Sequence, residues 1–298
     1  MKRLTAFLAA FLLALCAGVF AVAEDDEVLY LNLPIDFSPG NEINQKYYLS
    51  ETLYEDPTLR VEITTGSDNG RLYWIADIEI QDPSQLRTAA AESFDSKGSE
   101  SGSVLARRMN AVLAVNGDYY CYNTNSSANV TIRQGITFKN KLLRSPCQDV
   151  LLIDEDGDFH GVEDPRSGDI GTEIDGKKII NAFYFGPLLV NNGKIRKDKP
   201  PLHMNPNDPA QRVAIAQTGH LKYRVIVTGP NERGSKAFRF EDWREFVAGM
   251  DDILVAYNLD GGDSSVLVFN DQKINDPENR NERPLADIIY FASVWPGV

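Results

Sequence analysis

The feature that most constrains the fold is an alternation of apolar and polar residues with a period of two. It is clearest at residues 72–80, LYWIADIEI, and returns at residues 150–153 and 223–228. Because successive side chains of a strand point to opposite faces, these runs predict strands with one buried face. Asp156-Gly157 and Asn192-Gly193 lie between such runs and predict hairpin turns. The chain is therefore expected to be rich in antiparallel sheet.

Helical signals are fewer than strand signals. One short helix is predicted from a cap at Ser103 through Met109, and a better one opens at Glu241-Asp242 and runs through Met250. Many strands with few, irregularly placed helices favour an α+β fold over a regular βαβ array. We therefore expect a mixed, largely antiparallel sheet with a few packed helices in a single main domain.

The first residues differ from the rest of the chain. A positively charged head and a short apolar run lead to the A-x-A pattern of residues 21–23. Residues 1–23 are thus predicted to be a secretory signal peptide cleaved near Ala23, which makes the protein secreted or cell-surface. The alternative is a lipoprotein anchor at Cys16, although Leu15 is bulkier than the residue expected before such a cysteine.

The mature chain is predicted to have two parts. Residues 24–65 form an Asn- and Pro-rich N-terminal lead-in segment, and residues 66–298 form the main domain. After the signal peptide, no apolar run approaches the length that spans a bilayer, so we expect no transmembrane segment in the mature chain.

The charge of the chain limits its partners. Loss of Lys2 and Arg3 with the signal peptide changes the formal net charge by two, from −13 to −15. So acidic a protein argues against nucleic acid and against anionic membranes as partners. An anionic substrate stays compatible with this charge if local cations hold it.

Cysteine usage points to an oxidising compartment. Once Cys16 has left with the signal peptide, Cys121 and Cys147 remain, an even count that predicts a disulfide in an exported protein. The bond would close a loop of about 26 residues and contribute roughly 3 kcal/mol. The alternative is two separate thiols, because spacing alone does not bring their Cβ atoms together.

Four polar breaks interrupt the apolar runs at predicted strand ends. They are AVNGDYY at 114–120, FGPLLV at 185–190, QRVAIA at 211–216 and NLDGGDSS at 258–265. Glycines permit positive φ and a close approach of the backbone, so such ends can aim N–H groups at a ligand. A lone Asn-Gly or Asp-Gly usually marks only a turn. Four such breaks together indicate a site.

These segments resemble the phosphodiester glycosidase family. The matching stretches are AVNGDYY, FGPLLVNNGK, QRVAIA, NLDGGDSS and ERPLADIIYF, in the family's order, and the resemblance runs from about residue 50 to the C-terminus. It implies hydrolysis of a sugar-1-phosphodiester at the sugar C1–O bond, which releases the sugar and leaves a phosphomonoester.

The residues of these motifs suit that chemistry. Asp260 is the candidate carboxylate that stabilises or attacks the oxocarbenium-like centre, and Arg212 and Arg283 are candidates to neutralise the phosphate. Both arginines could instead pair with acidic neighbours such as Glu282. The predicted catalytic residues are Asp260, Arg212 and Asn116, and the predicted substrate-binding residues are Asp118, Asn258, Gly261, Gly262, Asp263, Ser264 and Arg283. Asn116 and Asn258 would orient sugar hydroxyls, and Ser264 with the two glycine amides would line an anion nest.

Asp118 and Asp263 stand where the family often has glycine. With Asp260 they could hold a divalent cation, Ca²⁺ or Mg²⁺, or they could be solvated turn residues. DEDGD at 154–158 is interpreted as a turn, because it lacks the later ligands of a calcium loop. The three histidines, His160, His203 and His220, lie outside the matching motifs, and we expect surface positions for them.

The sequence therefore predicts a secreted hydrolase acting on a phospho-glycan of a cell wall or exopolysaccharide. The competing class is a non-catalytic glycan- or cell-wall-binding protein that uses the same pocket. A third class is an envelope assembly factor in which the fold contacts only protein. Product release separates the first class from the second, since a binder saturates without turnover.

Overall fold

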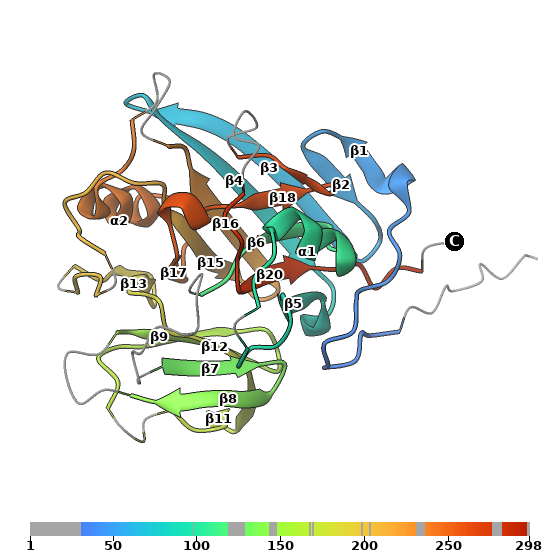
Figure 1. Cartoon of the computed structure of the whole chain (residues 1–298), viewed down its shortest axis with the longest axis horizontal. Coiled ribbons are helices and arrows are strands. Elements are labelled where there is room, and N and C mark those ends of the chain that lie inside the picture. The colour runs from blue at the N-terminus through green and yellow to red at the C-terminus, as the bar shows by residue number, and fades with distance from the viewer. Residues whose placement is uncertain are drawn as a thin grey trace, which may run out of the picture. The chain divides into compact units, whose positions relative to one another are not determined.

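The computed structural model describes residues 31–296 except 97, 119–128, 143–147, 167, 169, 198, 203, 231–235 and 276–281. The predicted signal peptide, Cys121, Cys147 and His203 therefore lie outside the described residues. From Leu31 onward the chain forms one compact unit (Figure 1). No helix in the described ranges is long and apolar enough to cross a membrane.

The largest sheet has nine strands and carries two of the predicted strands, β4 and β16. Its strands pair in the order β1 (Tyr48–Ser50), β2 (Leu53–Glu55), β3 (Leu59–Asp68), β4 (Arg71–Ile80), β16 (Lys222–Thr228), β15 (Val213–Gly219), β17 (Val255–Leu259), β13 (Leu188–Asn191) and β14 (Lys194–Ile195). β3 crosses the predicted boundary at residue 65, so the lead-in from residue 48 onward contributes strands to this sheet.

Two smaller sheets complete the described strands. The five-stranded sheet has the order β19 (Gln272–Lys273), β18 (Leu267–Phe269), β6 (Leu113–Asn116), β20 (Asp287–Phe291) and β5 (Leu86–Ala90). The six-stranded sheet has the order β10 (Phe159–Val162), β9 (Val150–Asp154), β12 (Lys177–Phe183), β7 (Asn129–Arg133) and β8 (Ile136–Lys141), with β11 (Glu173–Ile174) paired to β12. All strand pairs in the described part of the chain are antiparallel.

The main core lies between the nine-stranded and five-stranded sheets. Ile78 and Ile215 of the first sheet and Val115 and Ile289 of the second belong to one buried cluster, which Phe183 of the six-stranded sheet also joins. Burial of this continuous apolar surface is the dominant favourable term in folding. The two sheets thus form a sandwich, and the strand ends that carry the polar motifs lie at its margin.

Helices cover the outer faces of the sandwich. α1 (Gly102–Arg108) packs against the five-stranded sheet, and α2 (Phe240–Ala248) packs through Trp243 against the nine-stranded sheet. Single turns of 3-10 helix occur at η1 (Gln45–Tyr47), η2 (Pro83–Gln85) and η3 (Gly262–Ser264). Both predicted helices are confirmed, but α1 begins two residues earlier than predicted, with Ser101 rather than Ser103 at the cap.

The fold class needs one correction, because the protein is mostly β rather than α+β. α1 and α2 have 7 and 9 residues and are the α-helices of the described ranges. They cover sheet faces and do not form a helical layer comparable to the sheets. The predicted hairpin turns are confirmed: Asn192 and Gly193 have φ of 49° and 70°, and Gly157 has φ of 82° between β9 and β10.

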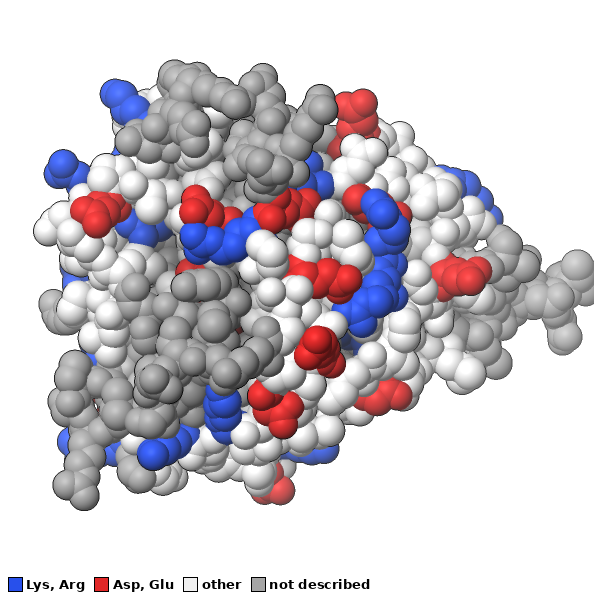
Figure 2. All heavy atoms as spheres, viewed as in Figure 1, with Lys and Arg blue, Asp and Glu red and all other residues white. Residues whose placement is uncertain are grey.

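The surface charges are mixed on the face drawn in Figure 2, where basic and acidic side chains adjoin one another in several places. Several described pairs form salt bridges of this kind, such as Arg71 with Asp242 at 3.0 Å and Arg108 with Glu100 at 3.0 Å. Exposed pairs of this type contribute little to stability, about 0–1 kcal/mol each.

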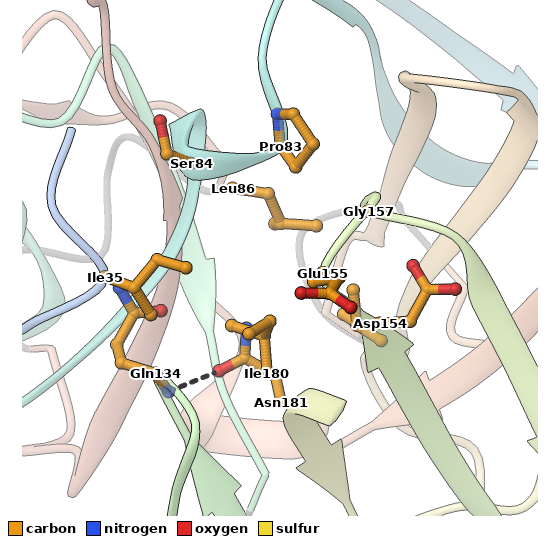
Figure 3. A pocket seen from close by; sticks show the side chains of 11 residues that line it. Ile35, Pro83, Ser84, Leu86, Gln134, Asp154, Glu155, Gly157, Ile180 and Asn181 are labelled. Carbon is orange, nitrogen blue, oxygen red and sulfur yellow. Dashed lines mark hydrogen bonds between the residues drawn. The ribbon is translucent and has the colours of Figure 1, made fainter. Parts of the chain in front are cut away.

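A small cavity lies where η2 meets the turns of the six-stranded sheet (Figure 3). Its volume is about 20 Å³, which is room for roughly one water molecule. Gln134 and Asn181 line it, and the Asn181 Oδ1 accepts the Gln134 backbone N–H at 3.2 Å. The cavity is too small for a sugar or a phosphate.

Candidate functional site

Asp260 stands at the C-terminal end of β17, where the apolar strand gives way to the glycines. Its residue is 9% exposed, so the carboxylate is largely withdrawn from water. The Oδ1 atom accepts the Gly261 backbone N–H at 2.9 Å, and the Asp260 carbonyl accepts the Asn116 side-chain amide at 2.8 Å. Gly261 thus binds the carboxylate and Asn116 binds the backbone of the same residue, and both belong to the matching motifs.

The two glycines after Asp260 are required for different reasons. A Cβ on Gly261 would lie 2.5 Å from the Gln211 carbonyl oxygen, so no other side chain fits there. Gly262 has φ of +57° and open space around its Cα, so its requirement is conformational. The Gly262 N–H donates to the same Gln211 carbonyl at 3.0 Å. The end of β17 is therefore fixed against the segment that leads into β15.

That segment places Arg212 beside Asp260. Val213 of β15 pairs with Leu259 of β17. Arg212, which precedes Val213, and Asp260, which follows Leu259, therefore lie at neighbouring strand ends. Directly opposite residues of an antiparallel pair share a face. Both side chains are expected on the face that α2 covers, where Ala214 and Ala256 of the same strands pack.

The Arg212 guanidinium is buried and anchored by the chain. Its Nε donates to the Phe238 carbonyl at 3.2 Å, one Nη donates to the Asp208 carbonyl at 2.8 Å, and the other contacts the Met204 sulfur. Burial lowers the pKa of Arg212 to about 10, against the opposing effect of Asp208, so it stays cationic at neutral pH. No described carboxylate lies within 4.0 Å of it, so the alternative of an acidic partner is not found for Arg212 in the described chain.

Asn116 joins the two sheets at the site. It ends β6, and its side chain donates to the Asp260 carbonyl and accepts the Val266 backbone N–H at 3.2 Å. The side chain is 2% exposed and its amide is engaged with backbone, so it positions Asp260. These bonds do not indicate the contact with a sugar hydroxyl that was expected for Asn116.

Asn258 has a similar structural role. Its Nδ2 donates to the Gly186 carbonyl at 2.9 Å, and its Oδ1 accepts the Trp243 indole N–H at 3.0 Å. It is fully buried. Asn258 therefore fixes the FGP segment, whose Gly186-Pro187 peptide is cis, against β17 and α2.

Asp118 is turned into the interior. Its carboxylate accepts the backbone N–H groups of Tyr184, at 2.8 Å, and Phe185, and it lies 3.6 Å from the Arg133 guanidinium, which also pairs with Asp287 at 3.1 Å. Burial raises the pKa of the Asp118 carboxyl to about 6, although Arg133 acts in the opposite direction. Asp118 thus connects the end of β6 to the end of β12, and this geometry does not favour its predicted contact with substrate.

The rim of the site is formed by η3 and Arg283. Arg283 donates to the Asp263 carboxylate at 2.6 Å and to the Ser264 hydroxyl at 3.3 Å. The ion-pair alternative is therefore found for Arg283, with Asp263 in place of Glu282, which accepts the Ser103 N–H. Asp263 has a side chain that is 80% exposed.

One further prediction needs correction, and one of two alternatives left open by the sequence is not found in the described chain. The Gly261 and Gly262 amides donate to Asp260 and to Gln211, so they do not form an anion nest. The described residues contain no group of three or more His, Cys, Asp or Glu arranged to hold a metal ion. Asp118 faces the interior and Asp263 faces solvent, so these two do not join Asp260 in such a group.

Other motif residues are placed as follows. DEDGD at 154–158 is a turn in which Asp154 accepts the N–H groups of Asp156 and Asp158, as predicted. His160 contacts the Asp154 carboxylate at 2.9 Å, and the exposed His220 contacts Asp158 at 3.1 Å. Neither histidine lies in the site.

Sequence reasoning missed the residues that hold the motifs from other elements. These residues come from segments outside the matching stretches. Arg133 contacts Asp118, and Trp243 contacts Asn258. Arg212 is contacted by Met204, Asp208 and Phe238. Only Arg133 carried a signal, because a charge within an apolar strand must find a buried partner.

Comparisons with known proteins bear on the fold and the family. No curated protein matches the sequence. The catalytic domain of zebrafish N-acetylglucosamine-1-phosphodiester α-N-acetylglucosaminidase, auto-inhibited by its pro-peptide, is similar in structure with a TM-score of 0.62 and 17% identity, over 91% of this chain and 99% of that one. A hypothetical protein from Synechocystis is similar with a TM-score of 0.52 and 14% identity, over 81% of this chain and 64% of that one. At these identities the likeness concerns the fold.

The family assignment comes from the sequence itself. The model of the phosphodiester glycosidase family matches residues 109–292, which is more than half of the chain. This range includes all five stretches on which the resemblance was based. The chain belongs to the phosphodiester glycosidase family.

Proposed function

We propose that the protein is an exported hydrolase that cleaves the sugar C1–O bond of sugar-1-phosphodiesters in a cell-wall or extracellular glycan. The observation that carries this proposal is the placement of Asp260 and Arg212 at adjacent strand ends. One residue supplies a largely buried carboxylate and the other a buried cation that has no described carboxylate partner. Family membership supports the reaction class.

The two groups match the charges of this reaction. As the C1–O bond breaks, its electron pair moves to the phosphate oxygen and positive charge develops at C1 of the sugar. Asp260 stabilises that centre or attacks it, and Arg212 neutralises the departing phosphate. Water supplies the hydroxyl at C1 and the proton balance, so the products are a free sugar and a phosphomonoester.

The decisive experiment is a panel of sugar-1-phosphodiesters with identification of both products. Asp260→Asn keeps the shape and removes the charge, so the rate should fall by roughly 10²-fold or more. Arg212→Ala should weaken both binding and turnover, because the phosphate is held throughout the reaction and more tightly as the bond breaks. Glu79→Gln and Arg60→Ala, which alter exposed salt bridges, are the matched controls and should keep the parent rate.

The results separate the function classes. An Asp260→Asn variant that cleaves a substrate at the parent rate would overturn the catalytic assignment. Saturable binding without product across the whole panel would favour the non-catalytic glycan-binding alternative. Loss of turnover in the exposed control variants would show that the assay reports stability instead of chemistry.

A further inference from the structure

A second recess lies away from Asp260, where the sandwich opens at one side. It has a volume of about 530 Å³ and lies between the β1–β2 turn, β3, β4 and the β18–β19 hairpin. Small-molecule sites commonly have volumes of about 300–1,000 Å³. Figure 1 shows β18 beside β3 and β4, so the recess, called here the hairpin groove, has one wall from each sheet.

The groove forms because the inner face of the large sheet becomes polar toward the β3–β4 turn. Ile63 of β3 is buried in the main core, but Thr65, the next residue on the same face, is exposed. Thr65 pairs with Trp74 of β4, which is only partly buried and packs at the edge of the core. The apolar filling of the sandwich therefore ends here, and an indole ring lies at the boundary with solvent.

The lining of the groove suits a sugar chain. Trp74 offers an apolar ring with a polar N–H, and Asn270 and Gln272 add amides beside it. The side chains of Trp74, Asn270 and Gln272 form no hydrogen bond to another described residue, so their donors and acceptors can serve a ligand. Aromatic rings pack on the C–H faces of sugars, and amides match their hydroxyls.

The charged residues that line the groove limit the class of ligand further. Glu51 and Lys273 are its charged lining residues, and they offset each other in formal charge. Neither forms a salt bridge with a described residue. A phosphate has no excess of cations to bind there, in contrast to the Arg212 side of the candidate active site. The groove thus favours an uncharged stretch of glycan.

Strand register separates the groove from the Asp260 side chain. Trp74 pairs with Val227, Val227 with Val213, and Val213 with Leu259, the residue before Asp260. Three steps between neighbouring strands correspond to about 14 Å. Val227, Val213 and Leu259 are buried in the main core, whereas the Asp260 side chain is expected on the opposite face of the sheet, which α2 covers. The groove is therefore a site separate from Asp260.

We infer that the hairpin groove binds a neutral glycan segment at a site separate from Asp260. This inference rests on the proposed function for the identity of the chain, but binding in the groove does not require turnover. Trp74 would stack on a sugar ring, and Gln272 and Asn270 would bind its hydroxyls.

Binding is tested by calorimetry with neutral hexasaccharides of glucose, galactose, mannose and N-acetylglucosamine. The parent should bind at least one of them, and Trp74→Ala should weaken that binding by about tenfold. Gln272→Ala changes an exposed side chain and should weaken binding severalfold even if Trp74→Ala proves unstable. Leu72→Ala, an exposed apolar change on the same strand and outside the groove lining, is the matched control.

Catalytic measurements then separate this inference from the proposed function. Asp260→Asn should bind the hexasaccharide as the parent does, and Trp74→Ala should leave kcat/KM for a small sugar-1-phosphodiester unchanged. Loss of all turnover in the parent would refute the proposed function and leave the binding test in place. The groove assignment is overturned if the parent binds no hexasaccharide at millimolar concentration, or if Trp74→Ala and Gln272→Ala bind like Leu72→Ala.

Discussion

Gly261 and Gly262 offer a test of the site in which adjacent residues should respond differently to the same change. In Gly261→Ala the new Cβ would lie 2.5 Å from the Gln211 carbonyl oxygen, whereas ordinary contacts begin near 3.4 Å. The strand end must therefore move by roughly 1 Å. In Gly262→Ala the Cβ meets no atom within 4 Å, so the cost is only that of a positive φ.

The expected magnitudes differ accordingly. Overpacking costs about 1–3 kcal/mol, and weakening of the Gly262 to Gln211 hydrogen bond adds about 1 kcal/mol to the loss for Gly261→Ala. Gly262→Ala should cost about 1–2 kcal/mol. Because Gln211 adjoins Arg212, a displacement of roughly 1 Å there can reduce turnover by about 10²-fold in Gly261→Ala. Gly262→Ala should retain most of the parent rate.

The assay combines urea unfolding with kcat/KM on one substrate that the parent cleaves. Gly262→Asn serves as the control for conformation, because asparagine tolerates positive φ and should recover part of the stability lost in Gly262→Ala. Equal effects of Gly261→Ala and Gly262→Ala on turnover would refute the argument from close approach. A Gly261→Ala variant with parental stability would refute the packing argument itself.

Two further predictions concern the interior and the disulfide. Asp118→Asn should lower the free energy of unfolding at pH 7 by about 1–3 kcal/mol, because its NH2 group would face the Tyr184 or Phe185 N–H and leave a buried donor without an acceptor. The pKa of Asp118 is about 6 in the folded protein against 3.8 ordinarily. Between about pH 4 and 6 the folded state therefore binds more protons at this group than the unfolded state does. The contribution of Asp118 to stability falls as the pH rises through this range. Unfolding in urea at several pH values should show that slope in the parent and not in Asp118→Asn, and identical curves would contradict the assignment. Cys121 and Cys147 are expected to be joined in the exported protein, so alkylation without reduction should add no mass, and labelling of both thiols would exclude the bond.

The local parts of the fold could be predicted from the sequence because their signals are local. The alternation at residues 72–80 became β4, and Asn192-Gly193 became the turn between β13 and β14. The pairing of β4 with β16, whose residues are distant in sequence, had no such signal. The fold class was predicted as α+β because the sequence shows two helical patterns. It does not show that both helices are short and only cover the faces of sheets.

The site was predictable as a location but not in every role. Asp260 and Arg212 lie at neighbouring strand ends as the polar breaks suggested, and Asn116 contacts Asp260 directly. Asp118 and Asn258 were expected to meet the substrate, but they bind the chain itself. A polar residue beside a glycine looks the same in sequence whether it faces a ligand or a buried N–H group. Only the tertiary contacts with Tyr184 and Trp243 distinguish the two.

The position of β20 has a consequence for the order in which the candidate site can form. This strand lies between β5 and β6, so the middle of the five-stranded sheet is completed by residues 287–291, about 200 residues after β5 in the chain. β6 carries Asn116, which holds the Asp260 carbonyl. A chain in which residues 287–291 have not yet been made would leave β5 and β6 without the strand that joins them. The Asp260 carbonyl should therefore gain its bond to Asn116 only after β20 has been inserted between β5 and β6.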